Sequence, residues 1–555
     1  MGSMPETPDA CGAYPRLTPA QLAALGKLGR RRAVPPGGTL FAEGDRNCDF
    51  FAILDGTVAV VEARGTPEER TLSTHGRGRF LGEVGLLTGQ AALYSAVATQ
   101  AAQVLAVPVD QLRELVATDA ALGDLIVRAY LIRRSIMISL GVGVRIVGSR
   151  YSPDARRLRD FVARNRIPAR WLDLEADPGA EEMLAQLGVS PGDTPLVILF
   201  GRQLLRNPGN AELARALGLP APASPETTCG LLVVGSGPAG LSAAVYGASE
   251  GLETVVVDGV ATGGQAATSS CIENYLGFPS GISGGELAER AVIQARKFGA
   301  RFTVPAEATA IGQHDGRFTV GLADGTSVTA RAVVIATGAR YRRLDVPRLA
   351  HFERSSVYYA ASQAEAQLCR DDPVAVVGGG NSAGQAVVFL AAHTPHLSLI
   401  VREQDLSENM SRYLISQIER LASVEVLLHA EVRELLGDET LDGLVVADNQ
   451  TGATRTLPAR ALFVFVGATP CTGWLGGLVD LDDRGFVRTG PDAGPDYGAE
   501  SGWHRSLLET SRPGMFAVGD VRSGSTKRVA AAVGEGAMAI RLAYERMRSD
   551  YAGAM

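Results

Sequence analysis

Leu231–Gly240, with the sequence LLVVGSGPAG, is the stretch that decides the fold of the larger part of this chain. Its first four residues are apolar and predict a buried strand, and the glycines after them predict a tight turn into a helix. Gly235 permits the turn, Gly237 lets the backbone approach a pyrophosphate, and Gly240 lets the helix pack on the strand. The phosphates of a ligand would then meet the helix N-terminus.

A second predicted strand, Glu253–Asp258 (ETVVVD), completes this pattern. It ends in Asp258, at the distance from the glycines where an acidic residue usually binds a ribose hydroxyl. The strand, the spacing and the acid together predict a dinucleotide site. An ordinary glycine turn without a ligand is the alternative.

The composition of the chain limits its domain number and its partners. The chain has 555 residues, of which 46% are hydrophobic and 20% are charged, and its formal net charge is −7. This length predicts three or four domains. The acidic balance argues against nucleic acid or an anionic membrane as the principal partner. Because we find neither an apolar run long enough to span a bilayer nor a signal-peptide pattern, we expect a cytoplasmic protein.

The cysteines are scattered and suggest no cross-link. The six are Cys11, Cys48, Cys229, Cys271, Cys369 and Cys471, and no two of them form a CxxC pair or a metal-ligand spacing. We therefore expect reduced thiols, no disulfide framework and no metal site.

Residues 15–144 show short β-type runs separated by glycine turns, followed by a helical stretch to about Leu140. This pattern predicts a small antiparallel barrel with a helix. Within it, FLGEVGLLTGQ (Phe80–Gln90) resembles the phosphate-binding cassette of cyclic nucleotide-binding domains. In that family a Gly-Glu pair, here Gly82 and Glu83, precedes an arginine, and the glutamate binds the ribose while the arginine binds the cyclic phosphate.

The arginine of that cassette is missing here, because Ala91 and Ala92 stand where a basic residue is expected. A cyclic phosphate would lose a charge-assisted bidentate contact. A cyclic nucleotide, another ligand and a neighbouring domain all stay open as occupants. No helix-turn-helix segment follows this domain, which argues against a transcription factor.

Alternating strands and helices over residues 145–220 predict a small α/β domain that resembles thioredoxins and glutaredoxins. Ser152–Ala155 (SPDA) occupies the position of that family's CPxC motif, and Thr194 with Pro195 matches its cis-proline. Serine cannot carry out thiol-disulfide exchange, so we expect a redox-inactive adaptor with a partner groove at Pro195. A simple packing spacer is the alternative. Residues 221–228 form the predicted linker.

The ordered motifs GSGPAG, GGQ, ENYLGFP, ATGA and GMFAVGD, between Gly230 and Met547, resemble a thioredoxin reductase-type flavoprotein. The resemblance implies an FAD domain in two halves, residues 229–347 and 462–555, around an NAD(P)H domain at residues 348–461. It also implies a homodimer in which the NAD(P)H domain rotates. The residues that it assigns to FAD are Gly235, Gly237, Gly240, Asp258, Gly264, Gln265, Asn274, Thr337, Gly338, Gly519, Asp520, Lys527, Arg528 and Val529.

A second glycine turn, VVGGGNSAG (Val376–Gly384), carries the GxGxxA pattern of a second nucleotide site. After the next strand, Arg402 would clamp a 2′-phosphate and Glu403 would repel one. We predict NADPH and leave NADH open; a solvated surface charge is the other interpretation of Arg402. The residues assigned to the nicotinamide cofactor are Gly378, Gly380, Asn381, Ser382, Ala383 and Arg402.

The chain departs from thioredoxin reductases at their CxxC motif, which precedes the second glycine turn in that family. Ala360 and Gln363 fall close to the cysteine positions, and Cys369 stands alone. Disulfide reduction by the usual route is therefore not supported. Two further candidates are open. Tyr358 and Tyr359 either stack near a flavin or nicotinamide ring or pack at a domain seam, and Cys271 is either a redox thiol or inert.

From these observations we predict an NAD(P)H-dependent flavin oxidoreductase of multidomain α/β and β-barrel architecture. Hydride would pass from the nicotinamide to N5 of FAD and then to an external acceptor, which is either a small molecule or a protein. The alternative is a ligand-sensing or redox-sensing regulatory protein in which the barrel governs assembly and the flavin is structural.

Overall fold

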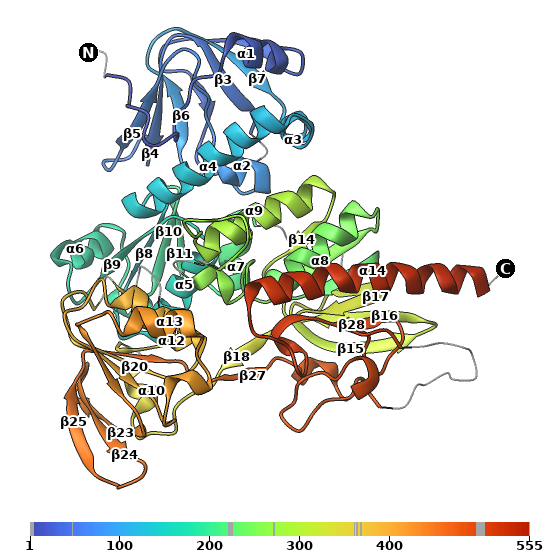
Figure 1. The fold of residues 1–555 in the computed structure, drawn as a ribbon. Coiled ribbons are helices and arrows are strands. Elements are labelled where there is room, and N and C mark those ends of the chain that lie inside the picture. The colour runs from blue at the N-terminus through green and yellow to red at the C-terminus, as the bar shows by residue number, and fades with distance from the viewer. Residues whose placement is uncertain are drawn as a thin grey trace. The chain divides into compact units, whose positions relative to one another are not determined.

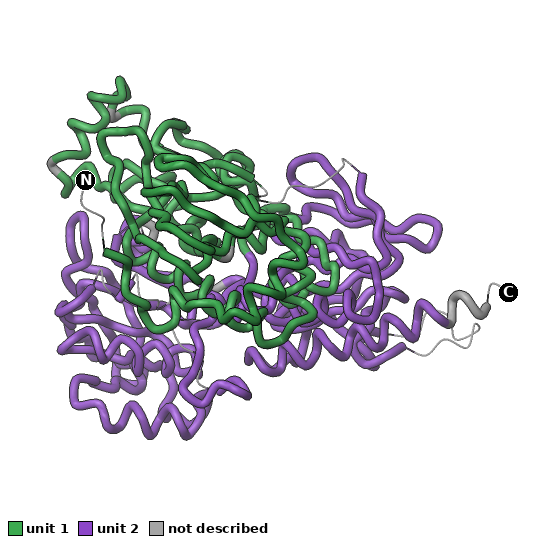
Figure 2. Tube along the Cα trace, turned by 90° about the horizontal axis from the view of Figure 1, so that it is seen from above, with its two compact units in different colours: residues 1–225, 259–261, 292–307 green, residues 226–258, 262–291, 308–555 purple. Residues whose placement is uncertain are grey.

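The computed structural model describes residues 5–46, 48–219, 226–269, 272, 274–353, 355–359, 361, 365–366, 369–494 and 505–553. The chain divides into two compact units (Figures 1 and 2). Unit 1 comprises residues 1–225, 259–261 and 292–307, and unit 2 comprises residues 226–258, 262–291 and 308–555. No helix among the described residues is long and apolar enough to cross a membrane.

Unit 1 begins with the predicted antiparallel barrel, which is confirmed. Two sheets with the strand orders β1-β7-β3 and β2-β6-β4-β5 form it, and all of their pairings are antiparallel. The strands are β1 (Arg30–Val34), β2 (Thr39–Phe41), β3 (Phe50–Asp55), β4 (Val58–Glu62), β5 (Arg70–His75), β6 (Ser95–Ala98) and β7 (Ala102–Val107). The helices are α1 (Pro19–Gly26), α2 (Val84–Thr88), α3 (Val109–Thr118) and α4 (Ala120–Leu140).

Helix α4 has clear local reasons to begin and end where it does. Asp119 caps its start, because a side-chain oxygen accepts a hydrogen bond from the backbone N–H of Leu122 at 3.0 Å. Gly141 ends the helix in the left-handed region, at φ +60°. In the core beneath it, the ring of Phe80 lies between those of Phe50 and Tyr130, at centroid distances of 5.5 and 5.9 Å.

The second part of unit 1 has the predicted thioredoxin-like topology. Its sheet has the order β9-β8-β10-β11, with β8 parallel to β9 and antiparallel to β10. The predicted cis-proline is confirmed, since the peptide bond between Thr194 and Pro195 is cis. The elements in chain order are β8 (Val144–Gly148), α5 (Pro153–Arg164), β9 (Ala169–Asp173), α6 (Pro178–Gln186), β10 (Leu196–Leu199), β11 (Gln203–Arg206) and α7 (Asn210–Ala216). Unit 1 also contains β14 (Arg301–Thr303).

One hydrophobic core runs through both parts of unit 1. Phe41 and Phe51 from the barrel belong to the same buried cluster as Leu158, Phe161 and Val197 from the thioredoxin-like part. The two parts therefore share apolar burial and are expected to unfold together.

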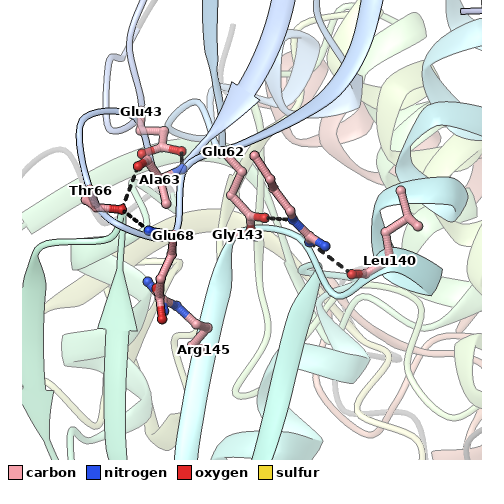
Figure 3. Close-up of polar contacts among 9 residues, drawn as sticks. Glu43, Glu62, Ala63, Thr66, Glu68, Leu140, Gly143 and Arg145 are labelled. Carbon is pink, nitrogen blue, oxygen red and sulfur yellow. Dashed lines mark hydrogen bonds and ion pairs between the residues drawn. The ribbon is translucent and has the colours of Figure 1, made fainter. Parts of the chain in front are cut away.

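Polar contacts around the connection between β4 and β5 also join the barrel to the thioredoxin-like part (Figure 3). One carboxylate oxygen of Glu62 accepts a hydrogen bond from the backbone N–H of Gly143 at 2.7 Å, and the other pairs with Arg70 at 2.5 Å. Arg145 on β8 forms an ion pair with Glu68. Glu43 accepts a hydrogen bond from the N–H of Ala63 at 2.6 Å, while burial raises the pKa of its carboxyl group.

Unit 2 contains the predicted dinucleotide-binding sheet, in which β13-β12-β17-β16-β15 are neighbours and β28 also pairs with β17. Strands β13, β12, β17 and β28 are parallel, and β17, β16 and β15 form an antiparallel meander. The elements are β12 (Glu226–Val234), α8 (Pro238–Ser249), β13 (Thr254–Val257), β15 (Ala308–His314), β16 (Arg317–Leu322), β17 (Ser327–Ile335), β28 (Met515–Ala517) and α14 (Val529–Gly553). Helix α9 (Gly284–Lys297) begins among the residues of unit 2 and ends among those of unit 1.

A second parallel sheet of unit 2 has the order β19-β26-β20-β21-β22. Strand β26 places residues up to Val464 in this sheet, just past the domain border predicted at residue 461. Its elements are α10 (Leu349–Phe352), β19 (Val357–Tyr358), β20 (Val374–Val377), α12 (Asn381–Leu390), β21 (Leu397–Ile400), α13 (Arg412–Ile418), β22 (Val424–Leu427) and β26 (Ala461–Val464). A three-stranded antiparallel sheet, β23 (Ala430–Gly437), β24 (Leu441–Asp448) and β25 (Thr454–Pro458), and the pair β18 (Ala339–Tyr341) and β27 (Ala468–Pro470) complete the unit.

The shared core of unit 1 makes a testable prediction. Phe161 is fully buried in it, so Phe161→Ala should destabilise unit 1 by about 3–5 kcal/mol. Hydrogen exchange of the full chain should then quicken in β2 and β6 of the barrel as well as in β8. Ala163→Ser, on the exposed side of the same helix, serves as the control and should leave exchange unchanged. Faster exchange confined to the thioredoxin-like part would contradict a common core.

Candidate functional site

The first glycine turn joins β12 to α8 through unusually close backbone contacts. Gly235 has φ +104°, and a Cβ there would lie 2.3 Å from the carbonyl oxygen of Ala336. A Cβ at Gly240 would lie 1.9 Å from the carbonyl oxygen of Gly235. Real Cβ atoms do not come this close to an oxygen, so the predicted turn requires glycine at both positions.

Gly237 and Gly264 face each other at the start of α8. Gly237 is the N-cap residue of the helix, and the nearest atom to a Cβ there would be the Cα of Gly264 at 3.9 Å. This turn thus leaves free space directly in front of the unpaired N–H groups of a 12-residue helix. A pyrophosphate fits such a place because the helix dipole and the free donors both favour an anion.

Asp258 follows β13 and lies against the same turn. Its Oδ2 accepts hydrogen bonds from the backbone N–H of Ser236 at 2.8 Å and from the Ser236 hydroxyl at 2.9 Å. Ser236 is fully buried. These bonds hold the carboxylate at the edge of the sheet where a ribose is expected, so the residues present fit the adenosine half of FAD.

The C-terminal motif around Gly519 and Asp520 lies beside α8 as well. Gly519 has φ +72°, and a Cβ there would lie 2.9 Å from the Cβ of Ala239. Its N–H donates to Glu535 Oε2 at 2.7 Å, and Glu535 also pairs with Arg522 at 2.5 Å. Burial raises the pKa of the Asp520 carboxyl group. Glu535 was not identified from the sequence as the anchor of this motif.

The other residues predicted for FAD lie at several places in unit 2. The Gln265 side chain donates to the carbonyl oxygen of Ala339, and the Thr337 hydroxyl donates to that of Cys471 at 2.8 Å. Lys527 Nζ donates to the carbonyl oxygen of Asp520 at 3.3 Å. Asn274 is exposed, and Arg528 and Val529 lie at the start of α14. Gly338 has φ +68°, and its carbonyl oxygen accepts a hydrogen bond from the N–H of Cys471 at 3.0 Å.

The second glycine turn joins β20 to α12 in the same manner. A Cβ at Gly378 would lie 2.4 Å from the carbonyl oxygen of Phe465. Gly380 is the N-cap residue of α12, and Ala383 is fully buried against the strand. Asn381 accepts a hydrogen bond from the N–H of Ser411 at 2.7 Å, and Ser382 is exposed. Two turns of this kind accommodate two nucleotides.

Glu403, and not Arg402, lies next to the second turn. A Cβ at Gly379 would lie 2.8 Å from Glu403 Oε2, and the Glu403 side chain is only 16% exposed. The Arg402 side chain is 75% exposed and bonds to Glu403 at 2.9 Å. A carboxylate at this place is suited to accept hydrogen bonds from a ribose diol and repels a phosphate.

Comparisons with known proteins agree with this geometry. The family model "Pyridine nucleotide-disulphide oxidoreductase" matches residues 230–536. The chain belongs to the pyridine nucleotide-disulphide oxidoreductase family. A second model, "Cyclic nucleotide-binding domain", matches residues 31–119.

The relatives of this family member include thioredoxin reductases. That of Eremothecium gossypii is 35% identical over 55% of this chain and 94% of its own length, and that of Treponema pallidum is 32% identical over 57% and 97%. The crystal structure of Lactococcus lactis thioredoxin reductase (FR conformation) covers 58% of this chain and 99% of its own, with 25% identity and a TM-score of 0.53. This oxidoreductase family member is thus an NAD(P)H-dependent flavin oxidoreductase with an added cyclic nucleotide-binding domain.

The two aromatic candidates, Tyr358 and Tyr359, contact neighbouring residues of unit 2. The ring of Tyr358 packs on that of Phe463 at 5.2 Å, and its hydroxyl donates to the carbonyl oxygen of Ser355 at 2.7 Å. The Tyr359 hydroxyl donates to Glu353 at 2.5 Å, and burial raises its pKa. These contacts are those expected of packed tyrosines; a role beside a cofactor stays a prediction.

Of the two thiols considered in the sequence analysis, the structure describes Cys369 but not Cys271. Cys369 is buried, its Sγ donates to the carbonyl oxygen of Glu365 at 3.1 Å, and burial raises its pKa to about 11. It is therefore protonated at neutral pH and a poor nucleophile. Cys271, Ala360 and Gln363 lie outside the described residues, so the predictions for them stay untested.

In the cyclic nucleotide-binding domain, the cassette glutamate already has a partner. Glu83 Oε2 accepts hydrogen bonds from Arg134 Nε at 2.8 Å and Nη2 at 2.5 Å, and both side chains are almost fully buried. Gly82 has φ +106°, and a Cβ there would lie 2.5 Å from the Tyr130 hydroxyl. Arg134 was missed by sequence reasoning, because it lies 51 residues further on, in α4.

In the thioredoxin-like part, the motif position serves a structural purpose. Ser152 caps α5 and accepts a hydrogen bond from the N–H of Ala155 at 3.3 Å. Pro195 lies beside the end of β8, where a Cβ at Gly148 would be 3.3 Å from the Pro195 Cα. A partner groove at Pro195 stays a prediction.

The space in front of α8 gives a test of the flavin site. Gly237 has ordinary φ and ψ values of −68° and −177°, and its surroundings leave room for a methyl group. Gly237→Ala should therefore fold but block the approach of the pyrophosphate, and lower flavin affinity about tenfold or more, or ~1.4 kcal/mol. The ratio of flavin to protein absorbance after dilution measures this loss. Gly534→Ala in α14, which also meets open space, should retain flavin; equal retention by both variants would contradict the assignment.

Proposed function

We propose that this protein takes hydride from a nicotinamide cofactor onto FAD and delivers the electrons to an acceptor outside its own chain. The observation that carries the proposal is the pair of glycine turns. Backbone oxygens fill the space of a Cβ at Gly235, Gly240 and Gly378, whereas a Cβ at Gly237 or Gly380, where the helices start, would meet no atom closer than 3.9 Å. Each turn precedes a helix whose first N–H groups face that opening. Since the sequence has no CxxC pair, the usual internal disulfide is not available as the next acceptor.

The proposed FAD residues act through position. Gly237 and the start of α8 hold the pyrophosphate, and Asp258 accepts a hydrogen bond from the adenosine ribose. Gly519 and Asp520, anchored by Glu535, lie along the ribityl chain. When bound, FAD supplies a carrier that accepts hydride and releases electrons to a further acceptor. The Gln265 side chain, which donates a hydrogen bond to the carbonyl oxygen of Ala339, is proposed to lie beside the bound FAD.

For the nicotinamide cofactor, we propose that Glu403 selects NADH over NADPH. Its carboxylate lies over the second glycine turn, where the ribose 2′-hydroxyl of NADH would donate a hydrogen bond to it. The 2′-phosphate of NADPH would meet this negative charge at short range. Arg402, which we expected to clamp that phosphate, is instead exposed and paired with Glu403.

The acceptor is proposed to be a small oxidant or a protein other than a thioredoxin. Cys369 is buried and protonated, and the thioredoxin-like part carries Ser152 at its motif. Neither Cys369 nor Ser152 can therefore take part in thiol exchange with a disulfide substrate. We further propose a homodimer, as the family resemblance implies, and a cytoplasmic location.

The cofactor preference is tested by kinetics. Wild-type protein mixed with NADH without oxygen should lose its visible flavin absorbance, with kcat/KM for NADH at least about tenfold above that for NADPH. Glu403→Gln should lower the NADH value and raise the NADPH value, because the ribose partner and the repulsive charge disappear together. Arg402→Gln is the matched control and should change the ratio little. If neither cofactor bleaches the flavin, the regulatory alternative with a structural flavin replaces this proposal.

The thiols are tested by substitution. Cys369→Ser and Cys271→Ser should each leave the rate of electron transfer to an artificial acceptor such as ferricyanide unchanged, since neither thiol is part of the proposed route. Reduction of a thioredoxin disulfide should be absent in wild type and variants alike. A large loss of acceptor reduction in Cys271→Ser alone would establish that thiol as part of the route.

A further inference from the structure

The barrel domain contains a half-open cavity of about 330 Å³ that the proposed oxidoreductase chemistry does not use. This volume lies within the usual range of small-molecule sites. Apolar side chains supply most of the wall, among them Val60 and Leu72 from the strands, Ile136 and Met137 from α4, and Leu81 before α2. The N-terminal segment adds Thr7, Pro8, Ala10 and Tyr14.

Arg133 brings one positive charge to this cavity. Arg133 is only 5% exposed. Its Nε donates a hydrogen bond to the carbonyl oxygen of Ala13 at 2.7 Å, and its Nη1 donates one to the carbonyl oxygen of Gly82 at 2.8 Å. Nη2 is buried and has no hydrogen-bond partner among the described residues. No described carboxylate forms an ion pair with Arg133, and burial lowers its pKa. The Arg133 Cζ atom lies 4.6 Å from the ring centroid of Phe80 and 5.4 Å from that of Tyr14, so aromatic rings compensate part of the charge. Nη2 still lacks a hydrogen-bond acceptor, which an anion would supply.

His75 and Ser73 add directed polar atoms to the same wall. His75 Nε2 lies 2.8 Å from the Ser73 hydroxyl, while Nδ1 is buried and without a partner. Burial, followed by the charges of Arg133 and Arg79, lowers the pKa of His75 to about 3, so the ring is neutral at pH 7. When the Ser73 hydroxyl donates to Nε2, Nδ1 carries the proton and offers a second donor.

The cavity does not offer what a cyclic nucleotide needs. No acidic side chain among the residues that the structure describes lines it, and Oε2 of the cassette glutamate, Glu83, is paired with Arg134. Ala91 and Ala92 supply no cation for the phosphate. Ribose hydroxyls would therefore meet mostly apolar walls without partners, at a cost for each.

We propose that this cavity binds a small organic anion with one carboxylate and an apolar body. The carboxylate pairs with the Arg133 guanidinium and the His75 ring, which both line the cavity and each have an unpartnered nitrogen. The apolar body lies between the strands and α4, against Leu72, Ile136 and Met137.

The N-terminal segment shields the bound molecule from water. It is fixed on β5, because Glu6 accepts a hydrogen bond from the N–H of Gly76 at 3.0 Å and pairs with Arg79 at 2.8 Å. The backbone N–H of Thr7 donates to the carbonyl oxygen of Thr74 at 3.0 Å. A charge pair formed beneath this cover is stronger than one in water.

Calorimetric titration of the full-length holoprotein tests the proposal with octanoate, its uncharged counterpart octan-1-ol, and cyclic AMP. Octanoate should bind at one saturable site, and octan-1-ol about tenfold more weakly or worse. Arg133→Gln should weaken octanoate binding about tenfold or more, whereas Arg128→Gln, an exposed arginine on the same helix, should not change it. Ile136→Trp, which keeps Arg133 but fills the cavity, should abolish octanoate binding and provides a second variant if Arg133→Gln does not fold.

Three results would overturn the proposal: no saturable octanoate binding, equal affinity for octanoate and octan-1-ol, or unchanged octanoate affinity in Ile136→Trp. Displacement of octanoate by a lower concentration of cyclic AMP would also overturn it, in favour of a nucleotide site. None of these outcomes depends on the flavin reaction, so the test is independent of the proposed function.

Discussion

The close approach of backbone to backbone at the two glycine turns is the constraint on which unit 2 depends. At the first turn, the carbonyl oxygens of Gly235 and Ala336 occupy the space of Cβ atoms, and at the second the carbonyl oxygen of Phe465 does so. Each helix can therefore begin directly at the carboxyl edge of its sheet, with its free N–H groups facing outward. The same absence of side-chain atoms forms the turn and leaves room for phosphates, so fold and binding share one cause.

Local sequence patterns predicted most of the architecture, because its signals lie within short segments. The strand-turn-helix of Leu231–Gly240 and the antiparallel barrel were predicted from neighbouring residues, and the structure confirms them. The cis bond before Pro195 was implied by the resemblance to thioredoxins and is also confirmed. The partners that complete the sites were not predicted. Glu535 reaches Gly519 and Arg134 reaches Glu83 across the fold, and a single sequence without an alignment carries no signal for such pairs.

The assignment of a cofactor-binding role to Arg402 or to Glu403 shows the same limit of prediction from a single sequence. Both residues follow β21, and the sequence alone allows either side chain to meet a ribose. Which one faces the turn depends on the path of the chain after the strand. That path places Glu403 beside Gly379 and leaves Arg402 mostly in solvent. The five cysteines among the described residues are free, and the sequence has no CxxC pair.

The ion pair between Glu83 and Arg134 has a thermodynamic consequence for the barrel. A ligand shifts a conformational equilibrium only as far as its affinities for the two states differ. Arg134 supplies the cassette with an internal counter-ion, and its Nη1 also donates to the carbonyl oxygen of Arg166 in the thioredoxin-like part, at 2.9 Å. The ion pair therefore links the cassette to the thioredoxin-like part within unit 1. A ligand that disrupts it would change the contacts between the two parts of unit 1 as well as those of the cassette.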